Sequence, residues 1–395
     1  MEVHIYQLPL KRNYIILNEE FNDALLNKLI QAPGTIANAS RLSGISKSVL
    51  GRYLRKERKR IRIDFLLKII CFLNIPLQET EKNICWIGAN NSQGITNPQL
   101  PFVFNTRASA RFLAAICNDG WISDGLYYSN SSKELRDSVK EDALSVFGGD
   151  EDTIKEWVKE KDQYLSFPSI MRDVLVLITD FKGVKSENNP PVPPFILEDR
   201  NLICGWVEQT IADEGHIAYR PDKYRREIIW RRSFSKNLNE YKLNRDERRM
   251  LNKIGIEYDV KNIGMYKTSK GIEKIRLHMR IAKRENVCKL RKLIKIPHPK
   301  KDKTFTEMTK NFKRYKEPSR VKNIIIKICK EKDYITTRDL ANSTNYKRIN
   351  NVHQWLSKYV KEGLLVCIQK HYHKNGHRGR IHTKYTLNRI KSQII

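Results

Sequence analysis

The sequence predicts an α+β protein built from three domains. Its 395 residues exceed the usual size of one domain. Segments whose apolar residues follow the helical period of 3.6 alternate with segments of period two, which is the period of a strand. Polar segments containing Gly or Pro interrupt these patterns at 89–101 and again between 297 and 319. We therefore expect domains at 1–88, 102–298 and 319–395.

The charge balance predicts a polyanionic partner. Lys and Arg number 74 against 44 Asp and Glu, which gives a formal net charge of +30. A DNA duplex carries one phosphate charge per about 1.7 Å of its axis, and each docked cation releases a counterion. Double-stranded DNA is therefore the expected partner. A basic surface that is merely solvated is the alternative that charge alone leaves open.

The cysteines and the hydropathy favour a cytoplasmic protein. The seven cysteines are scattered singly, without the CxxC pairs of a zinc ribbon. Their odd number, and a first segment without the features of a signal peptide, fit a reducing compartment. No apolar run approaches the roughly 20 residues of a membrane span, so no membrane partner is expected.

The first domain is expected to be helical throughout, with a DNA-reading helix near residue 50. The segment 35–56 (TIANASRLSGISKSVLGRYLRK) predicts two helices around a tight turn at Gly44, with Ser46 as the N-cap of the second helix. This segment resembles the helix-turn-helix of repressor-type proteins. The resemblance implies that Lys47, Ser48 and Arg52 face DNA. An ordinary helical hairpin, in which the glycine is only a C-cap, is the alternative.

The central domain contains a long-range near-repeat. FLAAICNDGW at 112–121 and VEQTIADEGH at 207–216 are both helical stretches that end in an acid followed by Gly, and strand-like residues follow each. The Pro-rich segment at 187–195 separates the copies into halves of about 102–190 and 195–298. Two matched acids are the residue type that holds a hard divalent cation beside a phosphodiester.

This near-repeat resembles the LAGLIDADG homing endonucleases. The resemblance implies a monomeric core of pseudo-twofold symmetry with the element order αββαββα, in which the two helices pack together through small residues. It implies that Asp119 and Glu214 converge at the helix ends, hold Mg²⁺ or Mn²⁺ and cleave double-stranded DNA. By the same likeness Lys185, between the halves, is a candidate catalytic lysine; a solvated loop lysine is the alternative. Asp213 is expected to be exposed or bound to backbone.

Departures from the family pattern leave a second function open. The first copy has Cys117 and Asn118 before its acid, and the second places Glu208 and Gln209 in the stretch that should pack. Buried polar groups are costly unless they are hydrogen-bonded. A non-cleaving transcriptional regulator on a degenerate scaffold is therefore the alternative to an endonuclease. RNA maturation is not favoured, because no RNA-type aromatic motif is visible.

Two basic segments of the second half are expected to form a DNA-contacting sheet. In KIRLHMRIAKREN (274–286), apolar residues alternate with cationic ones, so one strand face is apolar and the other basic. The major groove accepts such a two-stranded ribbon. An exposed face that serves only solubility is the alternative. The expected DNA contacts are Lys274, Arg276, His278 and Arg280, with Arg226, Arg231 and Arg232 from the segment 223–233.

The third domain has the order helix, helix, helix and hairpin, which looks like a winged helix. The third helix carries Arg348, Asn351 and Gln354, which are expected to reach base edges. The basic hairpin around 371–380 is expected to contact phosphates rather than to bind a metal through its histidines. A helical dimerisation module is the alternative for this domain.

Overall fold

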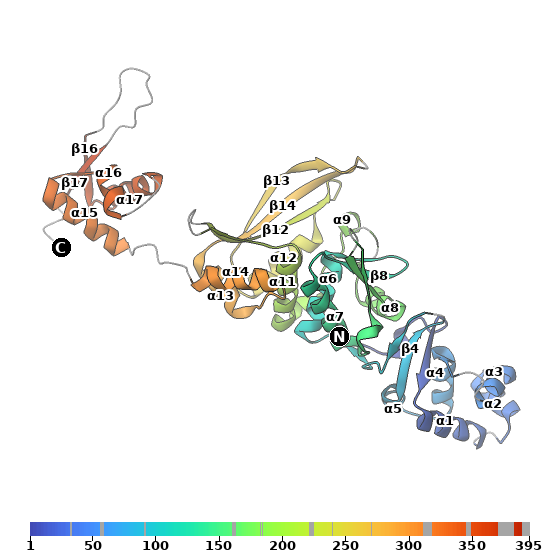
Figure 1. Cartoon of the computed structure of the whole chain (residues 1–395). Helices are drawn as coiled ribbons and strands as arrows, with labels where there is room; N and C mark the ends of the chain where they lie inside the picture. The colour runs from blue at the N-terminus through green and yellow to red at the C-terminus, as the bar shows by residue number, and fades with distance from the viewer. Residues whose placement is uncertain are drawn as a thin grey trace. The chain divides into compact units, whose positions relative to one another are not determined.

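The computed structural model is a mixed α and β structure that contains several small antiparallel sheets (Figure 1). The chain divides into two compact units, Met1–Asn311 and Phe312–Ile395. In the described part of the chain, no helix combines the length and the apolar character needed to cross a bilayer. The described residues are 1–31, 34–55, 59–90, 92–159, 163–181, 183, 185–220, 225–238, 240–269, 271–310, 318–344, 349–369 and 383–388.

The N-terminal region is not all helical, so that expectation was wrong. A four-stranded sheet of order β3-β2-β4-β5 accompanies its helices. The strand β2 alternates buried and half-buried residues, and a short apolar run of this kind does not by itself distinguish a strand from a helix. The elements are β2 (Asn13–Leu17), α1 (Glu19–Gln31), α2 (Ile36–Ser43), α3 (Lys47–Leu54), β3 (Ile61–Arg62), α4 (Ile63–Phe72), α5 (Leu77–Lys82), β4 (Ile84–Ala89) and β5 (Ile95–Thr96).

The turn between α2 and α3 has the expected local structure. Thr35 caps α2 by accepting a hydrogen bond from the backbone of Asn38. Gly44 follows α2 with a φ of 65°, a left-handed conformation that favours glycine. Ser46 occupies the N-cap position of α3, although its side chain makes no capping hydrogen bond.

The central region repeats one arrangement of helices and strands. The first half comprises α6 (Arg107–Asn118), β7 (Gly120–Ile122), β8 (Leu126–Ser129), α7 (Lys133–Phe147), β9 (Lys155–Val158), β10 (Gln163–Phe167) and α8 (Ser169–Ile178). The second comprises α11 (Arg200–Asp213), β11 (His216–Arg220), β12 (Arg225–Ser235), α12 (Lys242–Lys253), β13 (Asp259–Lys267), β14 (Glu273–Ile281) and α13 (Arg284–Leu293). Their sheets have matching orders, β7-β8-β10-β9 and β11-β12-β14-β13.

Two predicted linkers belong to the folded structure. Residues 89–101 include β5, and the backbone of Gln99 bonds to Phe147. The segment that begins at 297 forms α14 (Pro299–Lys310), which packs on β11 and α13. Between the halves, the Pro-rich segment leads from α9 (Lys185–Asn188) into α10 (Pro194–Glu198).

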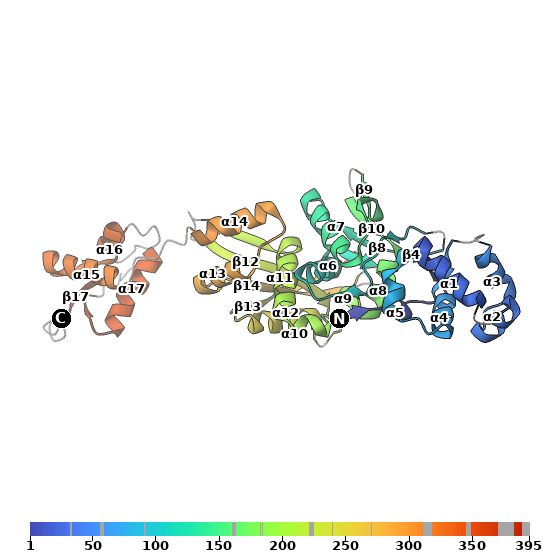
Figure 2. The same ribbon diagram turned by 90° about the horizontal axis from the view of Figure 1, so that it is seen from below.

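The helices α6 and α11 lie side by side at the centre of this unit (Figures 1 and 2). Their close approach requires Gly205, because a Cβ there would lie 2.6 Å from the carbonyl oxygen of Arg107. The small-residue contact is therefore displaced along α11 from Gln209 and Thr210. Glu208 is buried in the same interface, where the guanidinium groups of Arg107 and Arg111 lie 2.9 Å and 3.2 Å from its carboxylate. The buried charge of Glu208, which departs from the LAGLIDADG pattern, is thus compensated by ion pairs.

Within its described residues, the C-terminal unit has three helices and a small sheet of order β15-β17-β16. Its core includes Val321, Leu340 and Leu356, all fully buried. Arg348 and the hairpin tip at 370–382 lie outside the described residues, as does the side chain of Asn351; Gln354 is exposed. The elements are α15 (Pro318–Lys332), β15 (Ile335–Thr336), α16 (Thr337–Thr344), α17 (Ile349–Lys361), β16 (Leu365–Gln369) and β17 (Lys384–Leu387).

Candidate functional site

The C-terminal ends of α6 and α11 meet. Asp119 and Glu214 are the residues that end these helices, and the side-chain amide of Asn118 donates to the carboxylate of Asp213 across 3.1 Å. The glycine after each acid is required locally, because a Cβ on Gly120 would lie 2.7 Å from the Cα of Ile116. The tight turn brings the first strand of each half back beside its helix.

Each acid accepts a hydrogen bond from a side chain that lies in, or directly after, the second strand of its own half. Asn130, directly after β8, donates to Asp119 over 3.0 Å. Arg232, in β12, donates to Glu214 over 3.1 Å. Asn130 directly follows its strand and is neutral, whereas Arg232 lies within its strand and is charged. The two half-sites therefore differ in charge.

A lysine side chain caps the C-terminal end of each central helix by donating to its last carbonyl groups. The Nζ of Lys185 donates to the carbonyl oxygens of Ile116, at 2.6 Å, and of Asn118 and Gly120. The Nζ of Lys301 donates to the carbonyls at the end of α11, among them Ala212 at 2.5 Å. Both cations complement the negative end of a helix dipole. Lys185 thus lies at the predicted site rather than in a solvated loop, and all three of its N–H donors are engaged.

Burial and the repulsion between neighbouring carboxylates raise the pKa of two acids at the helix ends. Burial, and then the charge of Glu214, raises the pKa of Asp119. The guanidinium of Arg232 donates to Glu214 at 3.1 Å and to the side-chain oxygen of Asn118 at 2.8 Å, so the two helix ends that carry the acids lie close together. Burial also raises the pKa of Asp213 to about 7. Burial lowers the pKa of Lys185 and of Lys301.

Asp213 is neither exposed nor bound to backbone, contrary to the expectation. Its carboxylate accepts hydrogen bonds from the Tyr128 hydroxyl at 2.7 Å, from Gln209 at 2.9 Å and from Asn118 at 3.1 Å. These three donors are all contributed by the helix pair and the first sheet. Asp213 therefore fixes the helix ends to each other and has little capacity left for an external ligand.

Arg232 is not a surface residue, and its predicted contact with DNA is wrong. Its side chain is 4 % exposed and forms an ion pair with Glu247 of α12 in addition to its bond with Glu214. The indole of Trp230 donates to the same Glu247 at 3.2 Å. Strand alternation explains the error, because position 232 shares the face of Trp230, which is turned toward the helices.

The opposite, outer face of the second sheet carries most of the predicted cations. In the register, Arg231 is opposite His278, and Ser233 is opposite Arg276. Among the described residues, Arg231, Arg276 and Lys261 have no carboxylate partner, whereas Arg280 pairs with Glu227 and Asp259. The Nζ of Lys274 donates to the Ser186 hydroxyl at 2.6 Å. The outer face is therefore cationic, with part of its charge internally neutralised.

One further predicted contact needs correction. Arg226 lies on the helix-facing side of β12, and its guanidinium is 6.0 Å from the ring centre of Tyr219. It is not part of the outer face, for the same reason of strand alternation as Arg232. Burial lowers the pKa of His278, so the imidazole is less readily charged than its neighbours. In the N-terminal region, by contrast, Lys47, Ser48 and Arg52 are exposed on α3.

The oxygen donors at the helix ends fit part of the coordination of a hard divalent cation. No group of three or more His, Cys, Asp or Glu side chains in the described ranges is arranged to hold a metal. Mg²⁺ commonly binds through one or two carboxylates and completes its octahedron with water and substrate phosphate. Asp119 supplies a carboxylate of this kind at the end of α6. Glu214 is less available, because Arg232 already neutralises it.

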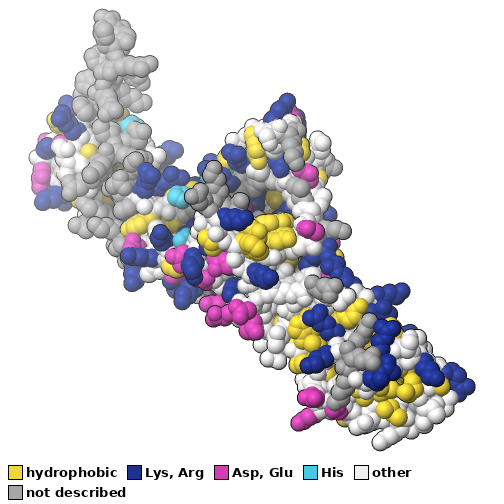
Figure 3. All heavy atoms as spheres, turned by 45° about the vertical axis from the view of Figure 1, so that its right-hand side comes forward, with side chains coloured by type: hydrophobic (Ala, Val, Ile, Leu, Met, Phe, Trp, Pro, Cys, Tyr) yellow, Lys and Arg dark blue, Asp and Glu magenta, His cyan; other side chains and the backbone are white. Residues whose placement is uncertain are grey.

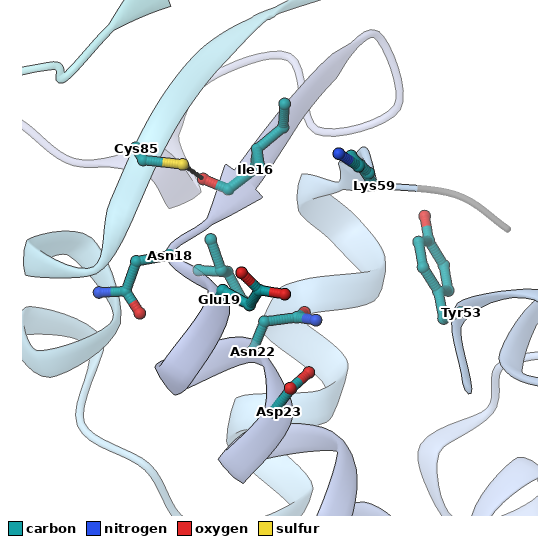
Figure 4. Close-up of a pocket in the computed structure, with 9 residues that line it drawn as sticks. Ile16, Asn18, Glu19, Asn22, Asp23, Tyr53, Lys59 and Cys85 are labelled. Carbon is teal, nitrogen blue, oxygen red and sulfur yellow. Dashed lines mark hydrogen bonds between the residues drawn. The ribbon is translucent and has the colours of Figure 1, made fainter. Parts of the chain in front are cut away.

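A separate pocket lies beside the end of α3, with a volume of about 300 Å³. Glu19 and Asp23 of α1 and Tyr53 of α3 line it, and the thiol of Cys85 donates to the carbonyl of Ile16 (Figure 4). Its two carboxylates make it unsuited to phosphate. None of its lining residues belongs to the acid pair at the ends of α6 and α11.

The comparisons with known proteins identify no family. No protein-family model matches the sequence, and no curated protein is significantly similar to it. Function must therefore be argued from the site. Figure 3 shows Lys and Arg side chains spread widely over the visible face, with Asp and Glu confined to a few groups.

Several residues of the site were not predicted from the sequence. Lys301 was assigned to a basic linker, although the pattern PHPKKDK does contain a helix start with Pro299 at its first position. Asn130 carried no signal beyond its place after a strand. The roles of Arg232 and Glu247 depend on which strand face is buried, which consecutive apolar residues at 228–230 do not reveal.

Proposed function

We propose that this protein binds double-stranded DNA and cleaves it in a Mg²⁺- or Mn²⁺-dependent reaction, on a LAGLIDADG-like core. The observation that carries the proposal is that Asp119 and Glu214 end the paired helices α6 and α11, whose ends are joined by hydrogen bonds of Asn118 and Arg232. Two halves of identical element order and sheet order support the LAGLIDADG-like assignment. A fold of this kind does not by itself prove an activity, so the acids carry the argument.

The residues support distinct parts of the chemistry. A divalent cation bound at Asp119 would lower the pKa of a water molecule and stabilise charge on the phosphate oxygens. Lys185 and Lys301 hold the helix ends in place; because each Nζ is committed to carbonyl oxygens, they act as positioning residues. The hydrogen bond from Asn130 orients Asp119, and among the described residues no side chain donates to its other carboxylate oxygen.

DNA binding is supported by several cationic surfaces. The outer face of the second sheet presents Arg231, Arg276 and Lys261, and α3 presents Lys47 and Arg52. Phosphate contacts of this kind make affinity fall steeply with salt. The order of elements in the C-terminal unit, with β15 between α15 and α16 and the strands β16 and β17 after α17, supports a winged-helix-like domain as a further DNA-binding part.

A non-cleaving DNA-binding regulator is the second candidate, and Arg232 is the observation that favours it. A buried guanidinium donates to one of the two proposed metal-binding carboxylates and is anchored by Glu247. A cation that must compete with this ion pair binds more weakly at Glu214. The remaining acid site would then depend on Asp119 alone.

A plasmid-cleavage assay separates the two candidates. Supercoiled DNA from the genomic neighbourhood of the coding sequence is incubated with the full chain in Mg²⁺, Mn²⁺ or EDTA. We expect metal-dependent nicked or linear product, lost in Asp119→Asn, with DNA binding retained. Glu141→Gln, an exposed acid on α7, is the matched control and should cleave normally. Binding without any nicking in either metal would reject cleavage in favour of the regulator.

A further inference from the structure

The outer face of the first sheet carries a continuous row of aromatic rings. Trp121 stacks on Tyr127 with ring centres 4.8 Å apart, and Tyr127 lies edge-on to Tyr164 at 5.9 Å. Trp157 stacks on Tyr164 at 6.3 Å. Each ring comes from a different strand, so the row crosses the sheet from β7 through β8 and β10 to β9.

The register places all four rings on one side of the sheet. Trp121 is opposite Tyr127, and Trp157 is opposite Tyr164. The alternating residues, including Tyr128 and Leu165, are buried toward the helices. The row is therefore the surface that the first half presents away from its core.

The row is exposed, and its neighbours are polar. Trp121 is 37 % exposed and Trp157 is 45 % exposed. The other outward positions of β8 and β10 are Ser129 and Ser166, and Lys155 lies opposite Ser166. The outer face of the first sheet thus combines aromatic rings with hydroxyl groups and an ammonium group.

The equivalent face of the second half is chemically different. There the outer positions carry cations such as Arg231, Arg276 and Lys261 in place of rings. Cations contact phosphates, whereas aromatic rings contact the faces of bases. Two sheets of the same topology in one compact unit thus suit two different parts of a nucleic acid.

We propose that the aromatic row binds single-stranded DNA by stacking on unpaired bases. In a duplex each base is covered by its neighbours, so ring faces are accessible only where the strands are separated. A row of rings flanked by hydroxyl and ammonium groups accommodates successive bases regardless of sequence. The choice of DNA rests on the proposed function, whereas the stacking surface does not.

Binding to oligonucleotides tests the proposal. Fluorescence anisotropy of the full chain is measured in EDTA, which prevents cleavage, with a single-stranded oligothymidylate and with a duplex. We expect Trp157→Ala and Trp121→Ala each to weaken single-strand binding by roughly 10-fold, and Trp157→Phe to retain most of it. Duplex affinity should change by less than about 2-fold, because the cationic surfaces remain.

Val158→Ala is the matched control. Val158 is 62 % exposed on the same strand as Trp157 but on the opposite face, so its variant should bind like the wild type. Melting temperatures confirm that the variants are folded. Unchanged single-strand affinity in both Trp variants overturns the proposal, and so does an equal loss of duplex affinity. Tighter binding of the matching oligouridylate overturns the assignment to DNA.

The outcome is distinguishable from that of the cleavage assay. Stacking is measured without divalent metal, and cleavage is tested at Asp119, which does not contact the row. Normal cleavage without binding of oligothymidylate would contradict the aromatic proposal alone. Single-strand binding that depends on Trp157, without any nicking of DNA, would contradict the cleavage proposal alone.

Discussion

Replacing Arg232 by Met should destabilise the unit Met1–Asn311 more than the replacement of an exposed residue does. Arg232 and Glu247 are 4 % and 3 % exposed, and their closest N–O distance is 2.5 Å. Removing the guanidinium leaves Glu247 as a buried carboxylate without its cation, a loss that typically costs about 3–5 kcal/mol. The hydrogen bond from Trp230 to Glu247 survives the change, so the cost reflects the missing charge rather than an unpaired indole.

The double variant Arg232→Met with Glu247→Gln isolates that cause. Gln is neutral and can still accept from Trp230, so the stability of the double variant should return to within about 2 kcal/mol of the wild type. The neighbouring Arg231→Met is the control. Arg231 is exposed on the outer face, and its replacement should change the stability by no more than about 0.5 kcal/mol.

Differential scanning calorimetry and urea denaturation measure these changes. The transition of the unit 312–395 serves as an internal reference, because it contains none of these residues. Two results would refute the reasoning: a cost for Arg232→Met no larger than that for Arg231→Met, or a double variant as unstable as the single one. Either would mean that Glu247 is not held as a buried anion by Arg232.

Two further substitutions probe the helix pair. Gly205→Ala should lower the free energy of unfolding by about 1–3 kcal/mol, because its Cβ would meet the backbone of Arg107 at 2.6 Å. Gly51→Ala is the control and should be neutral or stabilising, because its Cβ would meet only the flexible end of the Arg55 side chain. Urea midpoints that fall equally in the two variants would contradict this. Asp213 has a pKa raised to about 7, so its contribution to stability is greatest below the unfolded pKa of 3.8 and is lost as the pH rises through 7. Asp213→Asn should therefore flatten the fall in melting temperature between pH 5 and 8, and parallel curves for the two proteins would contradict it.

The central helices and the acids were predictable because their signals are local. Helical periodicity, the small residues of α6 and the glycine after each acid are all visible within ten residues of sequence. The same is true of the turn at Gly44, whose left-handed φ accounts for the glycine. That Asp119 and Glu214 meet at the helix ends was expected only from the resemblance to the LAGLIDADG family.

The donors around the acids were not predictable, because they depend on register. In β12 the apolar residues at 228–230 are consecutive, so the sequence does not show which of Arg231 and Arg232 points inward. A shift of one residue would exchange their environments. The aromatic row depends on register as well, since its rings come from four separate strands and form no motif along the chain.

The two halves differ at the acids and at the outer sheet faces, and these differences have a consistent direction. The first half combines an acid bonded to a neutral amide with a face of aromatic rings. The second combines an acid neutralised by a buried guanidinium with a face of cations. In the proposed function, a duplex held by the cationic face through its phosphates would have Asp119, the acid bonded to a neutral amide, in the half that also offers rings to separated bases. If the proposed function holds, the second half is the part better suited to holding DNA, and the first half is the part better suited to acting on a single strand of it.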